Sequence, residues 1–443
     1  MGSYVPSTME ERQAMLQAMG LSSVDELYDA IPSSVKLQGP LQIPEGLSEM
    51  EVRSKMEKLA GKNKVFPTVF RGAGAYRHYI PSIVKYIPAK EEFVTSYTPY
   101  QAEISQGVLQ AIFEYQTDMC QLMDMSVSNA SVYDGATAAA EGAAMCRERK
   151  RTKTLVSATA QPDTIQVMET YCQAANTELV IVPEKDGKTD KEALKELLDD
   201  TTACFYVQQP NYYGLFEDCE ELGQIVHEKG AKYIMGCNPI ALGVMATPGQ
   251  CGADVATAEG QPLGMPLAYG GPYLGIMTCS EKMMRKIPGR IVGETTDAEG
   301  NRAFVLTLQA REQHIRREKA SSNICSNQAL CALTASVYLA AMGPDGLRDV
   351  ANLCLSKAHY AAQQIAAIPG FEMVYQGEFF HEFVTSCPVC PQKVMQALEE
   401  KGILGGLPLT GDKKGQILWC VTEMNTKEEI DTLAETLKEV AGK

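Results

Sequence analysis

The sequence is marked first by what it lacks. Its 443 residues contain no internal repeat, no low-complexity tract and no run of roughly 18 apolar residues, which a transmembrane helix requires. Basic residues are also in deficit, because 40 Lys and Arg stand against 55 Asp and Glu and give a net charge of −15. We therefore expect no membrane and no nucleic acid among its partners, since both present negative charge to an anionic protein.

The cysteines and histidines lack the spacing of a disulfide framework or a metal site. The 14 cysteines are scattered singly apart from Cys387-Pro388-Val389-Cys390, and the five histidines form no ligand pattern. A lone CxxC motif is either a coincidence, which is the more frequent case, or a redox pair that opens a helix. The N-terminus shows no signal peptide. We expect a cytoplasmic protein with reduced thiols and no bound metal.

Secondary-structure signals divide the chain into three parts. Residues 1–65 contain capped helices with little hydrophobic mass, which indicates an N-terminal helical arm. Residues 66–343 alternate strands with helices and predict a large α/β domain with a mostly parallel sheet. Residues 344–443 follow a Gly-Pro breaker and predict a small α+β domain. The expected strands are 155–157, 179–182, 204–207, 233–235 and 255–257, and the main expected helices are 104–123, 163–174, 190–199, 218–229, 308–320 and 326–342.

Two glycine-containing turns are candidate ligand sites. Gly72-Ala73-Gly74 lacks the third glycine of a dinucleotide fingerprint and follows no clear strand, so we interpret it as a loop. The segment from Asp134 to Gly142 opens a helix made almost entirely of small residues. Free N–H groups at such a helix start suit a phosphate, whereas close packing of the helix on a sheet explains the same composition equally well.

Several motifs together resemble one enzyme family. They are 70–76 (FRGAGAY), 97–107 (YTPYQAEISQG), 134–141 (DGATAAAE), 261–264 (QPLG) and 311–320 (REQHIRREKA). Each is similar to a segment of glycine dehydrogenase (decarboxylating), the P-protein of the glycine cleavage system. The length and the start of the chain resemble subunit 1, the N-terminal (alpha) half in organisms that divide this enzyme between two chains.

The resemblance implies a fold, a reaction and a set of partners. The fold is that of the pyridoxal-phosphate-dependent transferases (aminotransferase fold type I), in agreement with the alternating pattern. The reaction is the decarboxylation of glycine and the transfer of its aminomethyl group to the lipoyl arm of the H-protein, with pyridoxal phosphate as the electron sink. The implied assembly is an α2β2 heterotetramer with glycine dehydrogenase subunit 2.

The residues that would hold the cofactor are missing. A pyridoxal enzyme carries its cofactor on a lysine, and no lysine occurs between Lys232 and Lys282. The strand end expected to offer an aspartate to the pyridine nitrogen offers the neutral amide of Asn238. We therefore expect pyridoxal phosphate in the partner subunit and no cofactor in this chain. The turn that remains as a degenerate cofactor site comprises Asp134, Gly135, Ala136 and Thr137.

The loop at 97–101 is the main candidate for a catalytic contribution. We expect four of its side chains to reach the partner's active site: Tyr97, Thr98, Tyr100 and Gln101. A phenol there can stack on the substrate or hydrogen-bond to it. The alternative is that these aromatic residues only stabilise the contact between subunits. Arg71 and His78 are weaker candidates for a contact with a carboxylate or with the H-protein.

Three functional hypotheses follow from these observations. The first is a cofactor-lacking subunit that is inactive alone and completes an active site at the interface with its partner. The second is a scaffolding or regulatory pseudoenzyme that holds the partner without touching substrate. The third is a free-standing pyridoxal-phosphate enzyme that uses an unexpected lysine such as Lys282.

Overall fold

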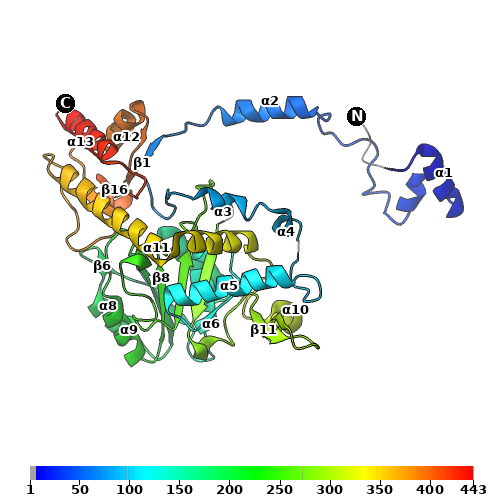
Figure 1. The fold of residues 1–443 in the computed structure, drawn as a ribbon, viewed down its shortest axis with the longest axis horizontal. Helices are drawn as coiled ribbons and strands as arrows, with labels where there is room; N and C mark the ends of the chain where they lie inside the picture. Colours follow the sequence, from blue (N-terminus) through cyan, green and yellow to red (C-terminus); the bar gives the residue numbers. More distant parts are fainter. Residues whose placement is uncertain (1–5, 97, 272, 443) are drawn as a thin grey trace. The chain divides into compact units, whose positions relative to one another are not determined.

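The computed structural model describes residues 6–96, 98–271 and 273–442 (Figure 1). Contacts within the chain divide it into two units, Met1–Val65 and Phe66–Lys443. The three-part division of the sequence, with its further boundary at residue 343, stays a prediction.

The first unit contains three short helices joined by irregular segments. They are α1 (Met9–Ala18), the 3₁₀ helix η1 (Val24–Tyr28) and α2 (Glu49–Ala60). Each begins at a predicted capping box, in which Thr8, Ser23 or Ser48 is paired with the glutamate three residues later. Leu16 is the only buried side chain between residues 6 and 65. The helices of this unit are therefore held by their own caps and not by a shared core.

The second unit is built around a seven-stranded sheet with the order β2-β10-β9-β8-β7-β3-β4. The neighbours from β9 to β4 run parallel, whereas β10 is antiparallel to both β9 and β2. The five predicted strands and the mostly parallel sheet are confirmed. The bounds are β2 (Val127–Ser128), β3 (Lys153–Ser157), β4 (Leu179–Val182), β7 (Thr202–Gln209), β8 (Lys232–Cys237), β9 (Val255–Glu259) and β10 (Gly275–Cys279).

Both faces of the sheet carry hydrophobic cores because neighbouring strand residues point to opposite sides. In β3, Val156 belongs to a core that includes α6, whereas Leu155 belongs to a second core that includes α9. The helices around the sheet are α5 (Gln106–Met123), α6 (Gly135–Cys146), α7 (Pro162–Ala174), α8 (Lys191–Leu197) and α9 (Cys219–Glu228). The shorter elements are α3 (Ser82–Tyr86), α4 (Glu91–Val94), β5 (Glu184–Lys185), β6 (Lys188–Thr189), η2 (Ala241–Gly243), η3 (Glu281–Met283), β11 (Val292–Thr296) and β12 (Arg302–Leu306).

The C-terminal part of this unit is a small antiparallel sheet whose hydrophobic core includes residues of three helices. Its strands have the order β13-β16-β15, and Trp419 is fully buried in the core beside them. A separate parallel pair joins β1 (Thr68–Val69) to β14 (Ile403–Leu404). The remaining bounds are β13 (Glu382–Ser386), α12 (Pro391–Glu400), β15 (Leu407–Pro408), η6 (Gly411–Lys413), β16 (Gln416–Cys420) and α13 (Lys427–Ala441).

The longest described helix, α11 (Ala329–Ala366), is interrupted at the predicted breaker. Gly343 has φ 64° and ψ 179°, which is outside the helical region, and Pro344 follows it. Alone among the described helices, α11 has the length and apolar composition of a membrane span, criteria that a core helix also meets. Ala332, Ala335 and Tyr338 of α11 belong to the hydrophobic core that also contains residues of α5.

The prediction of a single helix over 308–320 is wrong. The segment forms the 3₁₀ turn η4 (Gln309–Arg311), the short α10 (Gln313–Arg316) and the 3₁₀ turn η5 (Arg317–Lys319). Leu308 and Arg317 both adopt positive φ angles, which stop a right-handed helix. The cause lies in tertiary contacts, because Glu312 pairs with Arg290 and the Arg311 guanidinium donates to the Gly289 carbonyl at 2.7 Å.

Candidate functional site

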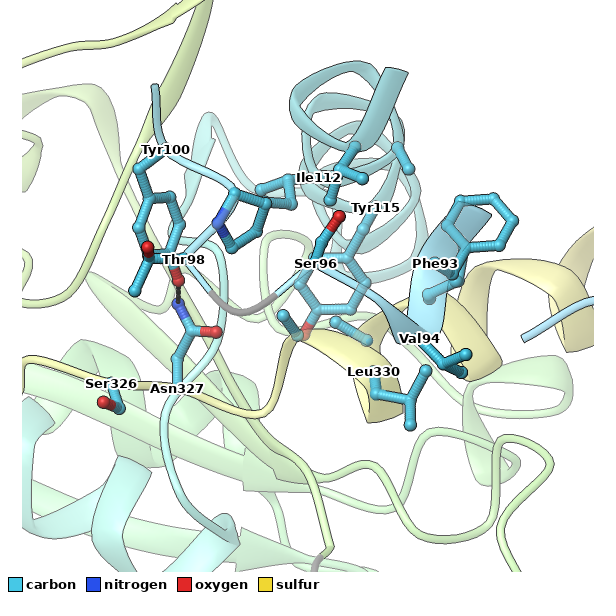
Figure 2. A pocket seen from close by; sticks show the side chains of 16 residues that line it. Phe93, Val94, Ser96, Thr98, Tyr100, Ile112, Tyr115, Ser326, Asn327 and Leu330 are labelled. Atoms are coloured by element: carbon cyan, nitrogen blue, oxygen red, sulfur yellow. Dashed lines mark hydrogen bonds between the residues drawn. The ribbon is translucent and has the colours of Figure 1, made fainter. Parts of the chain in front are cut away.

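Part of the loop at 97–101 lines an apolar cavity of about 250 Å³ (Figure 2). Thr98 and Tyr100 belong to the lining, whereas Gln101 is exposed and is not part of it. Tyr97 lies outside the described residues. Figure 2 shows the cavity between this loop, α5 and the start of α11. Its apolar wall includes Phe93, Val94, Val108, Ile112, Leu330 and Leu333.

Tyr100 is held in place on two sides. Asn327 Nδ2 donates a hydrogen bond to the Tyr100 hydroxyl at 3.0 Å (Figure 2), and the Arg290 guanidinium lies over the phenol ring with Cζ 5.2 Å from its centroid. Burial raises the pKa of Tyr100, so the phenol stays protonated at neutral pH. Because Asn327 is the donor, the phenolic hydrogen remains available for a second group.

Buried polar atoms without a partner occur on the two side chains that contact Tyr100 and on the neighbouring residues Arg311 and Glu312. Arg290 forms an ion pair with Glu312, a carboxylate that is only 7% exposed. Within the described part of the chain, four buried atoms of this group have no hydrogen-bond partner: Arg290 Nε, Arg311 Nε, Glu312 Oε1 and Asn327 Oδ1. An unsatisfied buried polar atom costs free energy, so each of these atoms is expected to bind water or another polar group.

The start of helix α5, which follows the loop, is fixed by the Gln106 side chain, which pairs with the backbone of β12 as a neighbouring strand would. Gln106 Oε1 accepts from the backbone N–H of Phe304 at 2.8 Å, and its Nε2 donates to the Phe304 carbonyl at 2.9 Å. This pair of bonds ties the first residue of α5 to β12. The start of α5, which follows the loop, is therefore anchored.

The predicted degenerate turn opens α6 at the end of the central strands. Asp134 is the N-cap, and its Oδ1 accepts from the Thr137 N–H at 2.7 Å. The neighbouring N–H of Gly135 donates to Glu259 Oε2 at 2.9 Å. The other oxygen of Glu259 accepts from the backbone N–H groups of Gln261 at 2.9 Å and Leu274 at 3.1 Å. Burial raises the pKa of Glu259 to about 7.

This turn borders a cavity of about 300 Å³ that does not fit pyridoxal phosphate. Its described lining includes three carboxylates, those of Asp134, Asp163 and Glu259, and no lysine or arginine. Asn238 Oδ1 accepts a hydrogen bond from the backbone N–H of Ile240 at 2.9 Å. The cavity therefore offers no amine for a covalent bond, no cation for a phosphate and no carboxylate at the pyridine position. No chemical step through this cofactor is assigned to these residues.

A second buried glutamate shapes the loop at 72–76. Glu382 Oε1 accepts from the Ala73 N–H at 2.6 Å, and its Oε2 accepts from the Tyr76 hydroxyl at 2.8 Å. Ala73 has a φ of 60°, and Gly74 has a φ of 113°, which confirms a turn. Burial raises the pKa of Glu382 to about 7.

Arg71 and His78 both make contacts inside the chain. The Arg71 guanidinium donates to the carbonyls of Gly405 at 3.1 Å and Gly406 at 2.8 Å. His78 Nδ1 lies 2.7 Å from Glu423 Oε2, and the His78 side chain is only 2% exposed. Cys354 and Glu423 together with His78 offer metal-binding atoms within 4.8 Å of one another, but here they hydrogen-bond to each other. Neither candidate lies in the cavity beside Tyr100, and their proposed external contacts stay predictions.

The sequence did not predict most of the residues that surround Tyr100 or that hold the turns at Ala73 and Asp134. Arg290 and Asn327 carry no local motif, and they reach Tyr100 only through the tertiary fold. Glu259 had a weak signal, because it begins the glycine-rich stretch that continues to Gly275 and suggests close backbone approach. Glu382 had none.

Comparisons with known proteins give matches over nearly the whole chain. The family model for the glycine cleavage system P-protein matches residues 2–437. A relative from Desulfitobacterium hafniense is 48% identical over 444 residues, with 99% of this chain and all of the relative covered. One from Moorella thermoacetica is 50% identical over 440 residues, which covers 98% of this chain and 99% of the relative. Both are named probable glycine dehydrogenase (decarboxylating) subunit 1.

Solved structures show the same relationship at two levels. A crystal structure of glycine decarboxylase (P-protein) in inhibitor-bound form superposes with a TM-score of 0.93 at 40% identity, over 99% of this chain and 100% of that chain. Glutamate decarboxylase from Lactobacillus brevis shares the fold alone, with a TM-score of 0.70 at 12% identity over 94% of this chain and 97% of that one. The fold is that of the pyridoxal-phosphate-dependent enzymes of fold type I, as expected. From its full-length matches, the chain belongs to the glycine cleavage system P-protein family.

Proposed function

We propose that this chain is the cofactor-free subunit of a two-chain glycine decarboxylase. With a lysine-bearing partner subunit, which would hold pyridoxal phosphate, it decarboxylates glycine and delivers the aminomethyl group to the lipoyl arm of the H-protein. The observation that carries this proposal is the pairing of full-length similarity to proteins named subunit 1 with a cofactor cavity that has no lysine and contains Glu259. The bound cofactor would supply the electron sink for decarboxylation.

The cavity beside Tyr100 is this chain's contribution to the shared site. Its apolar wall excludes water, and the Tyr100 hydroxyl can donate a hydrogen bond to a group that enters from the partner. The unpartnered Oδ1 of Asn327, which also lines this cavity, supplies a further acceptor at the same place. Thr98, an exposed residue of the cavity lining, and the exposed Gln101 would both face the partner subunit.

The first unit supports a heteromeric assembly. More than half of the exposed large hydrophobic side chains of the described chain lie between Met9 and Val65, a segment that is about an eighth of the sequence. In α2, Val52, Met56 and Leu59 form one exposed stripe at helical spacing. Exposed apolar side chains in this number mark a protein interface. We infer that the arm binds subunit 2 in an α2β2 complex.

The free thiols support a cytoplasmic location. All 14 cysteines are unpaired, and most of them are buried. Such a protein folds and persists in a reducing compartment.

The direct test compares the chain alone with the reconstituted pair. Release of carbon dioxide from carboxyl-labelled glycine should require both subunits and a lipoylated H-protein, and the chain alone should show no absorption band of bound pyridoxal phosphate. Borohydride reduction followed by peptide mapping checks Lys282 and every other lysine of the chain. Activity or a trapped cofactor in the isolated chain would refute the proposal.

The scaffold hypothesis is separated from a catalytic contribution by substitution of the phenol. Tyr100→Phe in the assembled enzyme should lower kcat about 10- to 100-fold, the scale of a lost hydrogen bond in a transition state, with little change in assembly. Tyr97→Phe tests the neighbouring ring in the same way. Tyr269→Phe, at a side chain 93% exposed, is the matched control. Unchanged turnover of Tyr100→Phe in an intact complex would favour the scaffold.

A further inference from the structure

The carboxylate of Glu259 lies at the N-terminus of α6, where a phosphate would bind. Its two oxygens accept three backbone hydrogen bonds, from Gly135 at 2.9 Å, Gln261 at 2.9 Å and Leu274 at 3.1 Å. Three N–H donors around one anion form the kind of cradle that enzymes present to a phosphate group. In this chain a side chain fills that cradle.

The backbone at this point is shaped around Glu259. A Cβ placed on Gly135 would come within 2.8 Å of the Glu259 backbone nitrogen, so the first residue of α6 touches the end of β9 directly. Glu259 itself is the last residue of β9 and points across to the helix start. The second acceptor at this helix start is the Asp134 carboxylate, which takes the Thr137 N–H.

We propose that the Glu259 carboxyl group takes the hydrogen bonds that a ligand phosphate would accept and closes this cavity to phosphorylated ligands, pyridoxal phosphate included. The inference rests on the proposed function, because it names the residue that keeps the cofactor out of this subunit. The missing lysine removes only the covalent bond. Glu259 removes the binding site of the phosphate as well.

Electrostatics makes the two anions mutually exclusive. A phosphate at the same amides would lie about 3–4 Å from the carboxylate, where like charges repel strongly in a partly buried site. The described lining offers no lysine or arginine to offset that repulsion, and Asp134 and Asp163 add to it. The Glu259 oxygens already occupy the N–H groups at this helix start, and as the pH rises through the raised pKa of about 7 the side chain adds a negative charge.

The test removes the Glu259 carboxyl group from the full-length chain, which is studied alone and assembled with its partner. Glu259→Ala should gain a saturable phosphate-dependent rise in Tm, of about 1–3 °C near ten times Kd, that sodium chloride at equal ionic strength does not reproduce. Glu259→Gln keeps an acceptor for the three amides and guards against a folding defect. It should respond to phosphate more than the wild type. Pyridoxine 5′-phosphate, which has no aldehyde, is the second probe.

The matched control is Glu217→Ala. Glu217 is also buried, and it accepts from the backbone N–H of Thr189 at 3.0 Å, but it does not line the cavity. Its loss should lower Tm without creating a phosphate response. Phosphate binding by the wild type in this cavity, or no gain in either Glu259 variant, would overturn the inference. A cofactor bound to a lysine of the wild-type chain would instead overturn the proposed function.

Discussion

At the scale of single residues, buried glutamates organise the second unit. Glu382 holds the turn at Ala73 and the Tyr76 hydroxyl, and Glu259 holds the start of α6. Both are carboxylates whose pKa burial raises to about 7, and each is surrounded by donors from segments distant in sequence. These contacts fix loops around the cavity. Because folding raises the pKa of both carboxyl groups, the stability of the protein should depend on pH.

For Glu382 the sign of that dependence is clear. Its pKa of about 7 in the folded chain exceeds the ordinary value of 4.5, so folding favours the protonated form. The stabilisation is complete below pH 4.5 and is lost as pH rises through 7. We expect the free energy of unfolding of the wild type to fall, relative to Glu382→Gln, by up to roughly 3 kcal/mol between those values.

Urea unfolding of both proteins at half-unit pH intervals measures this difference. Glu400→Gln, at an exposed position, is the control and should parallel the wild type at every pH. A constant difference between wild type and Glu382→Gln would show that the Glu382 pKa is not raised.

At the scale of elements, the sequence pattern predicted the parts whose cause is local. The runs in β3, β7 and β8 are buried on both faces, and continuous apolar character in a short segment predicts such strands. The capping boxes at Thr8 and Ser48 predicted helix starts for the same reason. The prediction of one helix over 308–320 is wrong because Glu312 and Arg311 bind groups near residue 290, and no local pattern reveals these contacts.

The candidate site divides along the same line. Tyr100 and the turn at Asp134 belong to continuous motifs and were found in the sequence. Arg290, Asn327 and Glu259 join them only after β10, β11 and α11 are folded. The absence of a lysine between Lys232 and Lys282 was visible in the sequence, but the carboxylate that occupies the phosphate cradle was not.

The break in α11 gives a prediction for one glycine. Gly343 has φ 64° and ψ 179°, a region open almost only to glycine, and an added Cβ would meet no atom within 4 Å. Gly343→Ala should therefore cost about 1–3 kcal/mol of stability through backbone strain alone.

Gly107→Ala is the matched control. An added Cβ there also meets nothing within 4 Å, and Gly107 lies inside α5 without a positive φ. We expect this change to be neutral or to stabilise by up to ~1 kcal/mol. Equal effects of the two substitutions in urea unfolding would contradict the assigned strain.

At the scale of the whole molecule, the two units differ in how many buried hydrophobic side chains each contains. The hydrophobic cores of the second unit are formed by side chains from Phe70 onward. Within the first unit, Leu16 is the one buried side chain of the described residues 6–65. Folding and assembly should therefore be separable.

Removal of residues 1–65 tests that separation. The shortened chain should keep its circular dichroism spectrum and a cooperative thermal transition, because its cores are intact. Its affinity for the partner subunit should fall at least ~100-fold, equivalent to about 3 kcal/mol of lost apolar contact. Substituting Val52, Met56 and Leu59 with alanine is the milder version and should weaken binding in the same direction. Undiminished assembly of the shortened chain would contradict the role given to the arm.

The pairing of β1 with β14 has a consequence for synthesis on the ribosome. Thr68 donates to Glu429, 361 residues later in the chain, and Val69 accepts from Asn425. At roughly 5–20 residues per second, the strand at 68–69 waits about 20–70 s for its partners to emerge. The large sheet can form during that time, whereas the small sheet closes only when translation ends. The last event in folding thus joins the two ends of the second unit.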